Sequence, residues 1–396
     1  MSNQQKISAR SGLKVIGQEL DRLFAWIEAR KLADANLLLL TGLLVVLAIA
    51  SSLPNYSRFE FGGGKLGNAA MEWKFQNPMS PIPVRQIMEQ EHDGVSPGIV
   101  SHLEKRSYRL LVPLLAHTFG FGLKTALIIQ QVLACLLLLL ALATLRKIFQ
   151  DNLSALFAGM MMAVIFPGQW GFCDFFCFDG YGYFLIALAI WTTSPWVLAA
   201  AVFAGGLSDE RVIMVTPLIW LWISIRNGCC ADGFGIRSLL WPRANHFALS
   251  AAVILFVLLR LYIAVKWGSF YEASDICQWA VIKKCIHFLP SAILTGLKGG
   301  IIPFFAALAL LVARRRLVLL ALAVCAVIPS LTTTLMVFDL SRSLYYAFPA
   351  LFMVMAVLAQ QCSISDCRKI TFCAFLGSVI FPTCYVCPFS ITLLNY

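Results

Sequence analysis

Long runs of apolar residues, separated by short polar segments, make up most of this 396-residue chain. A membrane-spanning helix needs about 20 apolar residues, and a shorter run fits a broken helix that neighbouring helices shelter. The runs predict an all-α fold: a polytopic transmembrane helical bundle of about eleven spans, several of them short or broken. The predicted spans are residues 36–52, 126–145, 152–168, 180–193, 195–207, 211–226, 247–265, 299–313, 317–335, 343–360 and 370–390.

The first polar stretch, residues 1–36, is basic and has a helical repeat of apolar positions. We expect a helix that either lies on the membrane surface with its apolar face inserted, or is solvated before the first span. The predicted organisation is a cytoplasmic basic segment, 1–36, followed by a transmembrane helical domain, 37–396. The repeating apolar residues are Leu13, Ile16, Leu20, Phe24 and Ile27.

The second polar stretch, residues 54–125, is the longest in the chain and predicts a long first extracytoplasmic loop. Residues 108–120 inside it are apolar, but the run is too short to span a membrane and contains Pro113. It therefore predicts an interfacial or half-buried helix.

Composition supports a membrane protein, since 60% of the residues are hydrophobic and 13% are charged. Soluble domains have about 45–50% apolar and about 25% charged residues. A net charge of +11 is also found in nucleic-acid-binding proteins. This chain has no nucleic-acid-binding motif, and in a membrane protein such an excess reflects basic residues near anionic head groups. We therefore expect membrane lipids, and no nucleic acid, as partners.

Basic residues also predict which side each loop faces, because cytoplasmic loops are enriched in Lys and Arg. With the N-terminus in the cytoplasm, the inner segments carry 16 basic residues and the short outer segments carry only Arg342. Other outer basic residues lie mainly in the two long loops, 54–125 and 266–298, which this rule discounts. The inner segments are 1–36, 146–151, 226–246, 314–316 and 361–369, and the short outer ones are 169–179, 208–210 and 336–342.

This topology places the charged residues nearest the hydrophobic runs on one side of the membrane. A charge at membrane depth is costly unless it faces water or another charge. We therefore expect any chemistry at the outer face. The residues concerned are Asp93, Asp174, Asp179, Asp209, Glu210, Asp339 and Arg342.

Asp174 and Asp179 lie in an aromatic segment that follows a predicted span. An interfacial belt accounts for the aromatic residues, but it does not account for two carboxylates among them. A carboxylate in an apolar, half-wet loop has a raised pKa, which suits general acid or base catalysis. Both are candidate catalytic residues, and either would also suit a cation or a sugar hydroxyl. His92 and Asp93 form a further acid/base candidate, with a turn at Asp93-Gly94 as the alternative.

The segments Ser208–Arg211 and Asp339–Arg342 each precede an apolar run. Ser208, Asp209 and Asp339 suit helix N-caps, and acidic residues are favourable at a helix N-terminus. The Arg211 guanidinium must either extend to water or pair with an acidic group. Pairing with an aspartate would join two loops into one polar cluster.

Arg342 opposes the helix dipole at its position, which makes it a candidate anion ligand. Arg106 and Arg109 are further candidates, with a solvated charge run as the alternative. The candidate substrate-binding residues are Asp209, Glu210, Arg211, Asp339, Arg342 and Arg109.

The layout resembles the GT-C superfamily of polytopic membrane glycosyltransferases, including uncharacterised bacterial members. The shared features are a long first outer loop, outer acidic residues, many short helices, and Arg at the helix starts in Ser208–Arg211 and Asp339–Arg342. In that family a carboxylate early in the first outer loop acts as base or binds metal. This chain offers Glu60, Glu72 and Asp93 there, without a clear two-acid motif.

The resemblance implies sugar transfer from a polyprenyl-phosphate-linked donor at the outer face of a bacterial inner membrane. An outer carboxylate would deprotonate the acceptor, Arg211 and Arg342 would hold the donor phosphate, and a divalent cation is a candidate cofactor. Two other classes stay open. A secondary transporter or lipid flippase would place charges near the bilayer midplane on broken, repeated helices, and we find no clear repeat. A non-catalytic assembly protein of an envelope polysaccharide pathway is the third.

Overall fold

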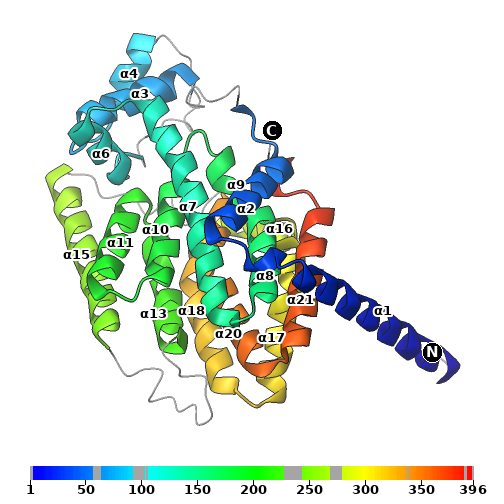
Figure 1. Cartoon of the computed structure of the whole chain (residues 1–396). Helices are drawn as coiled ribbons and strands as arrows, with labels where there is room; N and C mark the ends of the chain where they lie inside the picture. Colours follow the sequence, from blue (N-terminus) through cyan, green and yellow to red (C-terminus); the bar gives the residue numbers. More distant parts are fainter. Residues whose placement is uncertain are drawn as a thin grey trace.

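The computed structural model describes residues 3–56, 64–91, 103, 106–226, 243–267, 279–336, 339–387 and 390–394, and within them the chain is almost entirely helical (Figure 1). The all-α prediction is therefore confirmed at the level of fold class. The N-terminal elements are α1 (Asn3–Ala29), α2 (Leu37–Ser52), α3 (Gly64–Gln76), α4 (Val84–Glu91) and α6 (Leu111–Phe119).

The central helices are α7 (Leu123–Phe149), α8 (Asn152–Val164), α9 (Phe166–Cys173), α10 (Asp179–Trp191), α11 (Pro195–Ser208), α12 (Arg211–Met214), α13 (Thr216–Ser224) and α15 (Ala244–Trp267). The C-terminal elements are α16 (Trp279–Leu297), α17 (Ile301–Ala313), α18 (Leu317–Leu335), α19 (Leu340–Tyr345), α20 (Pro349–Gln361), α21 (Ile364–Ile380), β1 (Cys384–Cys387) and β2 (Ser390–Leu393). Two short 3₁₀ turns, Leu32–Asp34 and Lys298–Gly300, precede α2 and α17.

Four helical segments in the described residues are long and apolar enough to cross a membrane: α7, α15, Ile282–Ala313 and α18. The pair α8 and α9 adds a fifth if a span with a 47° bend is counted. Along α15, large apolar side chains such as Leu258 and Val265 are exposed, as expected for a surface that faces lipid. The prediction of an integral membrane protein with several spans is confirmed at this level.

Prolines explain why several predicted spans are broken. Pro167 and Pro217 each stand in the first turn of a helix that begins one residue after the preceding helix has ended, and Pro349 begins α20 after a turn of three residues. Proline lacks an N–H group and blocks the preceding helical turn, but it fits the start of a helix. The predicted span 211–226 is therefore divided into α12 and α13, and 343–360 is divided between α19 and α20.

Two predicted segments have a different structure. The region 266–298 was expected to be an outer loop, but it contains α16, which continues almost directly into α17. The predicted span 370–390 ends at Ile380, just before Pro382, and is followed by the antiparallel hairpin of β1 and β2. A residue before proline is disfavoured in the helical conformation, which accounts for the early end.

The helix expected in residues 1–36 is α1, which projects from the bundle in Figure 1. Its C-terminal half is anchored by Phe24, which is buried against the rings of Phe157 and Phe372 at centroid distances of 5.6 Å each. Asp21 and Lys369 form an ion pair of 2.9 Å across the same contact.

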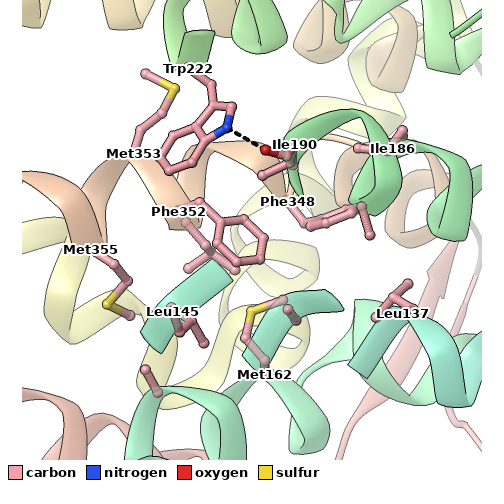
Figure 2. Close-up of a cluster of buried hydrophobic side chains, with 14 of the residues drawn as sticks. Leu137, Leu145, Met162, Ile186, Ile190, Trp222, Phe348, Phe352, Met353 and Met355 are labelled. Atoms are coloured by element: carbon pink, nitrogen blue, oxygen red, sulfur yellow. Dashed lines mark hydrogen bonds between the residues drawn. The ribbon is translucent and has the colours of Figure 1, made fainter. Parts of the chain in front are cut away.

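The core of the bundle is apolar and lies between α7, α8, α10, α13 and α20. Figure 2 shows Leu137, Met162, Phe348 and Phe352 gathered there, all of them buried. The indole Nε1 of Trp222 donates a hydrogen bond of 2.9 Å to the carbonyl oxygen of Ile190, which satisfies a polar atom inside this core (Figure 2).

The helices α3, α4 and α6 lie together at one end of the bundle, called the loop end below (Figure 1). The interfacial helix expected in residues 108–120 is α6, and it buries Val112 and Ala116 against Met71 and Phe75 of α3. This small helical cap covers the residues described next.

Candidate functional site

Five charged residues meet beneath the cap at the loop end, and we call them the charged cluster: Arg109, Asp179, Asp209, Arg211 and Arg342. Arg109 precedes α6, Asp179 begins α10, Asp209 and Arg211 flank the junction of α11 and α12, and Arg342 lies in α19. Four of the five are almost fully buried, and 19% of the Arg109 side chain is exposed. Buried charges are stable only when they are paired and hydrogen-bonded, so these segments hold one another in place.

Asp179 is the centre of the charged cluster. Its carboxylate is fully buried and accepts hydrogen bonds from side chains of four different segments. Three of these donors are guanidinium groups, which carry their positive charge at every relevant pH. The donors are Arg342 Nε at 2.5 Å, Trp170 Nε1 at 3.0 Å, Tyr346 Oη at 3.2 Å, Arg109 at 3.4 Å and Arg211 at 3.5 Å.

Asp209 and Arg211 form a bidentate ion pair, with distances of 2.7 and 2.6 Å from the guanidinium nitrogens to the two carboxylate oxygens. Asp209 also accepts the backbone N–H of Arg211 at 3.0 Å, and Arg109 approaches its other oxygen at 2.6 Å. Burial would raise the pKa of Asp209, but Arg109 and Arg211 outweigh burial and hold this pKa below its usual range. The pairing predicted for Arg211 is thus observed, and it includes Asp179.

Asp174 has a different environment from Asp179, although the two lie in one loop. Its Oδ1 accepts the backbone N–H groups of Phe176 and Cys177 at 3.0 and 2.6 Å, and its Oδ2 accepts that of Asp179 at 2.8 Å. These bonds fix a tight loop that ends in Phe178, whose φ of 57° is left-handed. Asp174 therefore shapes the loop that presents Asp179.

Glu210 and Asp339 lie at the edge of the charged cluster, which we call its rim. Glu210 is half-exposed and pairs at 3.0 Å with Arg260 of α15, away from the charged cluster. Asp339 occupies the N-cap position of α19, and its carboxylate contacts Arg342 at 2.6 Å and accepts a hydrogen bond from the Tyr385 hydroxyl. Asp93, with its neighbour His92, lies outside the described residues.

The solvated charge run considered for Arg106 and Arg109 is wrong. Arg106 is buried: it donates to the Phe176 carbonyl at 2.7 Å and to Cys177 Sγ at 3.3 Å, and it stacks on the Phe176 ring. The interfacial belt is also wrong for Trp170 and its neighbours, because they are buried inside the protein. Trp170 lies near two carboxylates in the sequence, and its indole N–H is a hydrogen-bond donor. This combination is a signal that would have predicted its hydrogen bond to an aspartate.

Sequence reasoning also missed Gln130, Ser343 and Tyr346. Gln130 is a buried amide within the apolar helix α7, and it donates to the Asp174 carbonyl at 2.5 Å. Ser343 accepts a hydrogen bond of 3.0 Å from Arg211, and Tyr346 lies one helical turn after Arg342. A polar residue inside a long apolar run, as at Gln130, is a usable signal because it needs a buried partner.

A small cavity reaches the charged cluster from the side of the cap. Its volume is about 10 Å³, which is room for about one water molecule. Arg109 of the charged cluster lines this cavity, together with Arg106. The lining residues are Met71, Arg106, Arg109, Val112, Pro113, Cys177, Phe178 and Ser208.

Asp174, Cys177 and Asp179 each offer one potential metal-ligand atom, within 4.8 Å of one another. They do not fit a divalent cation as arranged. The oxygens of Asp174 and Asp179 already face N–H and guanidinium donors, and burial raises the pKa of the Cys177 thiol to about 12. A cation here would meet the positive charge of Arg342, so this group of residues does not support the divalent cation considered as a candidate cofactor.

Comparisons with known proteins give this chain no family. Its function therefore has to be inferred from the charged cluster and the apolar helices. No protein-family model, curated protein or solved structure matches the chain.

Proposed function

We propose that this protein is a GT-C-like membrane glycosyltransferase, which transfers a sugar from a polyprenyl-phosphate-linked donor to an acceptor hydroxyl at the extracytoplasmic face of a bacterial inner membrane. In this proposal the helices α2, α10, α11, α13, α20 and α21 also cross the bilayer, which together with the five segments described above gives about eleven spans with the N-terminus in the cytoplasm. The lipid-linked sugar and membrane lipids are its partners.

One observation carries the proposal: the guanidinium groups of Arg109, Arg211 and Arg342 converge on the single carboxylate of Asp179. Arginine binds phosphate through the same planar, paired contacts that it makes with a carboxylate. A donor phosphate is larger than the cavity under the cap, so it would have to displace the cap to enter beside Arg109, and it would then meet all three groups. It would replace the Asp179 carboxylate as their anionic partner.

That exchange also provides a base. Asp179 is a poor base while three guanidinium groups hold it, but its basicity rises when the phosphate takes them. Asp179 then accepts the acceptor hydroxyl proton while the acceptor oxygen attacks C1 of the donor sugar. The bond between C1 and the phosphate oxygen breaks, and Arg211 and Arg342 stabilise the charge that develops on the leaving polyprenyl phosphate.

The arrangement of the helices is compatible with this location. The charged cluster lies at the loop end and includes Arg342 of α19, which follows the end of α18. The basic turn between α17 and α18, with Arg314, Arg315 and Arg316, lies at the opposite end of α18. Basic turns of this kind face the cytoplasm. The apolar grooves between short helices would receive the prenyl chain.

A second function, secondary transport or lipid flipping, is favoured by a specific observation. The helix pair α8 and α9 is bent by 47° at its break, and α12, which begins at Arg211 of the charged cluster, breaks before α13. Transporters place substrate sites at such broken helices. A transporter would open and close the charged cluster without making or breaking a covalent bond.

The test uses the full chain in proteoliposomes, with radiolabelled polyprenyl-phosphate-linked hexose as probe and envelope membranes as acceptor. Asp179→Asn and the double variant Asp174→Asn/Asp179→Asn are compared with Glu210→Gln, a rim control of the same chemistry. We expect a covalent glycosylated product from the wild type and the control, and none from the two cluster variants. Flipping of the probe without product would instead establish the transporter. Stable cluster variants with unaltered product would reject the catalytic role and leave an assembly protein.

A further inference from the structure

The helix α1 carries an apolar face that the rest of the chain does not cover. Val15, Ile16, Leu23 and Trp26 are 56%, 59%, 38% and 54% exposed, and we call them the exposed α1 face. At 100° per residue these four positions fall within an arc of about 100°. Phe24, on the neighbouring side of the helix, is buried against α8 and α21, so the exposed α1 face has a fixed direction.

Two of the three acidic residues of α1 face the rest of the protein, and the third, Glu19, is exposed and pairs with Arg22 at 2.6 Å. The acidic residues Asp21 and Glu28 turn toward α21, where they pair with Lys369 at 2.9 Å and Arg368 at 2.5 Å. On the uncovered side, the guanidinium of Arg30 lies over the Trp26 ring, 5.3 Å from its centroid. The protein thus pairs Asp21 and Glu28 with α21, while the uncovered side is apolar and carries Arg22 and Arg30, of which Arg22 neutralises Glu19.

The N-terminal sequence of the chain is positively charged as well. Residues 1–18 contain Lys6, Arg10 and Lys14 and no acidic residue. An amphipathic helix with a basic polar side binds at a membrane surface through apolar burial and attraction to anionic lipids. The charge on α1 therefore complements an anionic lipid surface.

The position of α1 next to α2 in the chain also supports a lipid surface as its partner. The short segment 30–36, which contains the turn Leu32–Asp34, separates α1 from α2, an apolar helix whose Leu38 and Leu39 are 67% and 69% exposed. Those α2 side chains require lipid, so the lipid surface begins where α1 ends. Leu32, in the connecting turn, is exposed as well and continues the apolar surface from one helix to the other.

We propose that α1 lies in the bilayer interface with the exposed α1 face inserted among anionic phospholipids. The ion pairs to α21, and the contact of Arg368 with Asp151 at 2.7 Å, then tie this lipid contact to the first turns of α8 and α21. The proposal concerns the membrane-facing surface of α1 and does not depend on the reaction at the charged cluster.

Photo-crosslinking of the full chain tests this. p-Benzoylphenylalanine replaces Trp26 or Ile16, and in a matched control it replaces Gln18, an exposed residue outside the apolar arc. Each variant is placed in nanodiscs of phosphatidylcholine with or without phosphatidylglycerol, and its melting temperature is compared with the wild type to exclude misfolding. We expect phosphatidylglycerol adducts at Trp26 and Ile16 about fivefold more often than at Gln18, with labelling reduced by salt.

Three results would overturn the proposal. Equal lipid labelling at Gln18 would show that α1 has no lipid-facing side. Adducts between two chains at Trp26 or Ile16 would make a second copy the occupant of the exposed α1 face. Phosphatidylcholine adducts as abundant as phosphatidylglycerol adducts would remove the preference for anionic lipid.

Discussion

The Nε atom of Arg342 lies 2.5 Å from Oδ2 of Asp179, although the two residues are 163 positions apart in the chain. Both side chains are buried, so neither charge has water as an alternative partner. The contact fastens α19 to the start of α10 beneath the cap. Taking two charges out of water is costly, and removing one of them leaves the other without compensation.

Arg342→Leu should therefore lower the free energy of unfolding by about 3–5 kcal/mol. Arg22→Leu is the matched control, because Arg22 pairs with Glu19 at 2.6 Å on the exposed surface of α1. Exposed pairs of this kind contribute about 0–1 kcal/mol. Denaturant unfolding in detergent micelles measures both variants. Equal effects of the two substitutions would mean that Arg342 is not held as a buried charge.

Asp174→Asn tests whether Asp174 shapes the loop or reacts. The amide places an NH₂ group where a carboxylate oxygen now accepts a backbone N–H, so at least one buried donor loses its partner. We expect a loss of about 1–3 kcal/mol in the free energy of unfolding. The control Glu89→Gln, at an exposed acidic side chain of α4, should change it by only about 0.5 kcal/mol. Loss of transferase activity with unchanged stability would instead make Asp174 a catalytic residue.

The sequence allowed good predictions wherever one local pattern decides the structure. The spans at α7, α15 and α18 follow from long apolar runs, and the pairing of Arg211 follows from the cost of an unpaired charge beside an apolar helix. The burial of Arg106 could not be predicted, because it depends on Phe176 and Cys177, which lie about 70 positions away in the chain. The choice of Asp179 over Asp174 as the centre of the charged cluster likewise depends on tertiary contacts.

Lys74 in the cap gives a pH-dependent prediction. It is buried, its ammonium donates to the Ser80 carbonyl at 2.7 Å, and it lies 4.9 Å from the centroid of the Trp267 ring. Burial, with a smaller contribution from Arg260, lowers the pKa of Lys74 to about 7. The unfolded chain, with a lysine pKa of about 10.4, then binds more protons than the folded chain between about pH 7 and 10. This residue should therefore make the fold more stable as pH rises through that window.

Lys74→Met should remove this dependence. At pH 6 the folded wild type carries the full cost of a buried charge, so the variant should be more stable by on the order of a few kcal/mol, since a pKa change of one corresponds to about 1.4 kcal/mol. The advantage should shrink toward pH 10. Lys65→Met, at an exposed lysine of the same helix, is the control and should show no such trend. A stability difference between Lys74→Met and wild type that stays constant from pH 6 to 10 would contradict the prediction.

Reporter fusions test whether the charged cluster faces one side of the membrane. Gly206 lies near the end of α11, three residues before Asp209, and Ser341 is adjacent to Arg342. Because Asp179 contacts Arg211 and Arg342, fusions after Gly206 and Ser341 should both report the extracytoplasmic side. A fusion after Arg316, in the basic turn between α17 and α18, should report the cytoplasm. A cytoplasmic signal at Gly206 would mean that α10 and α11 have the opposite orientation, and the proposed site for an extracytoplasmic donor would then have to be abandoned in favour of transport.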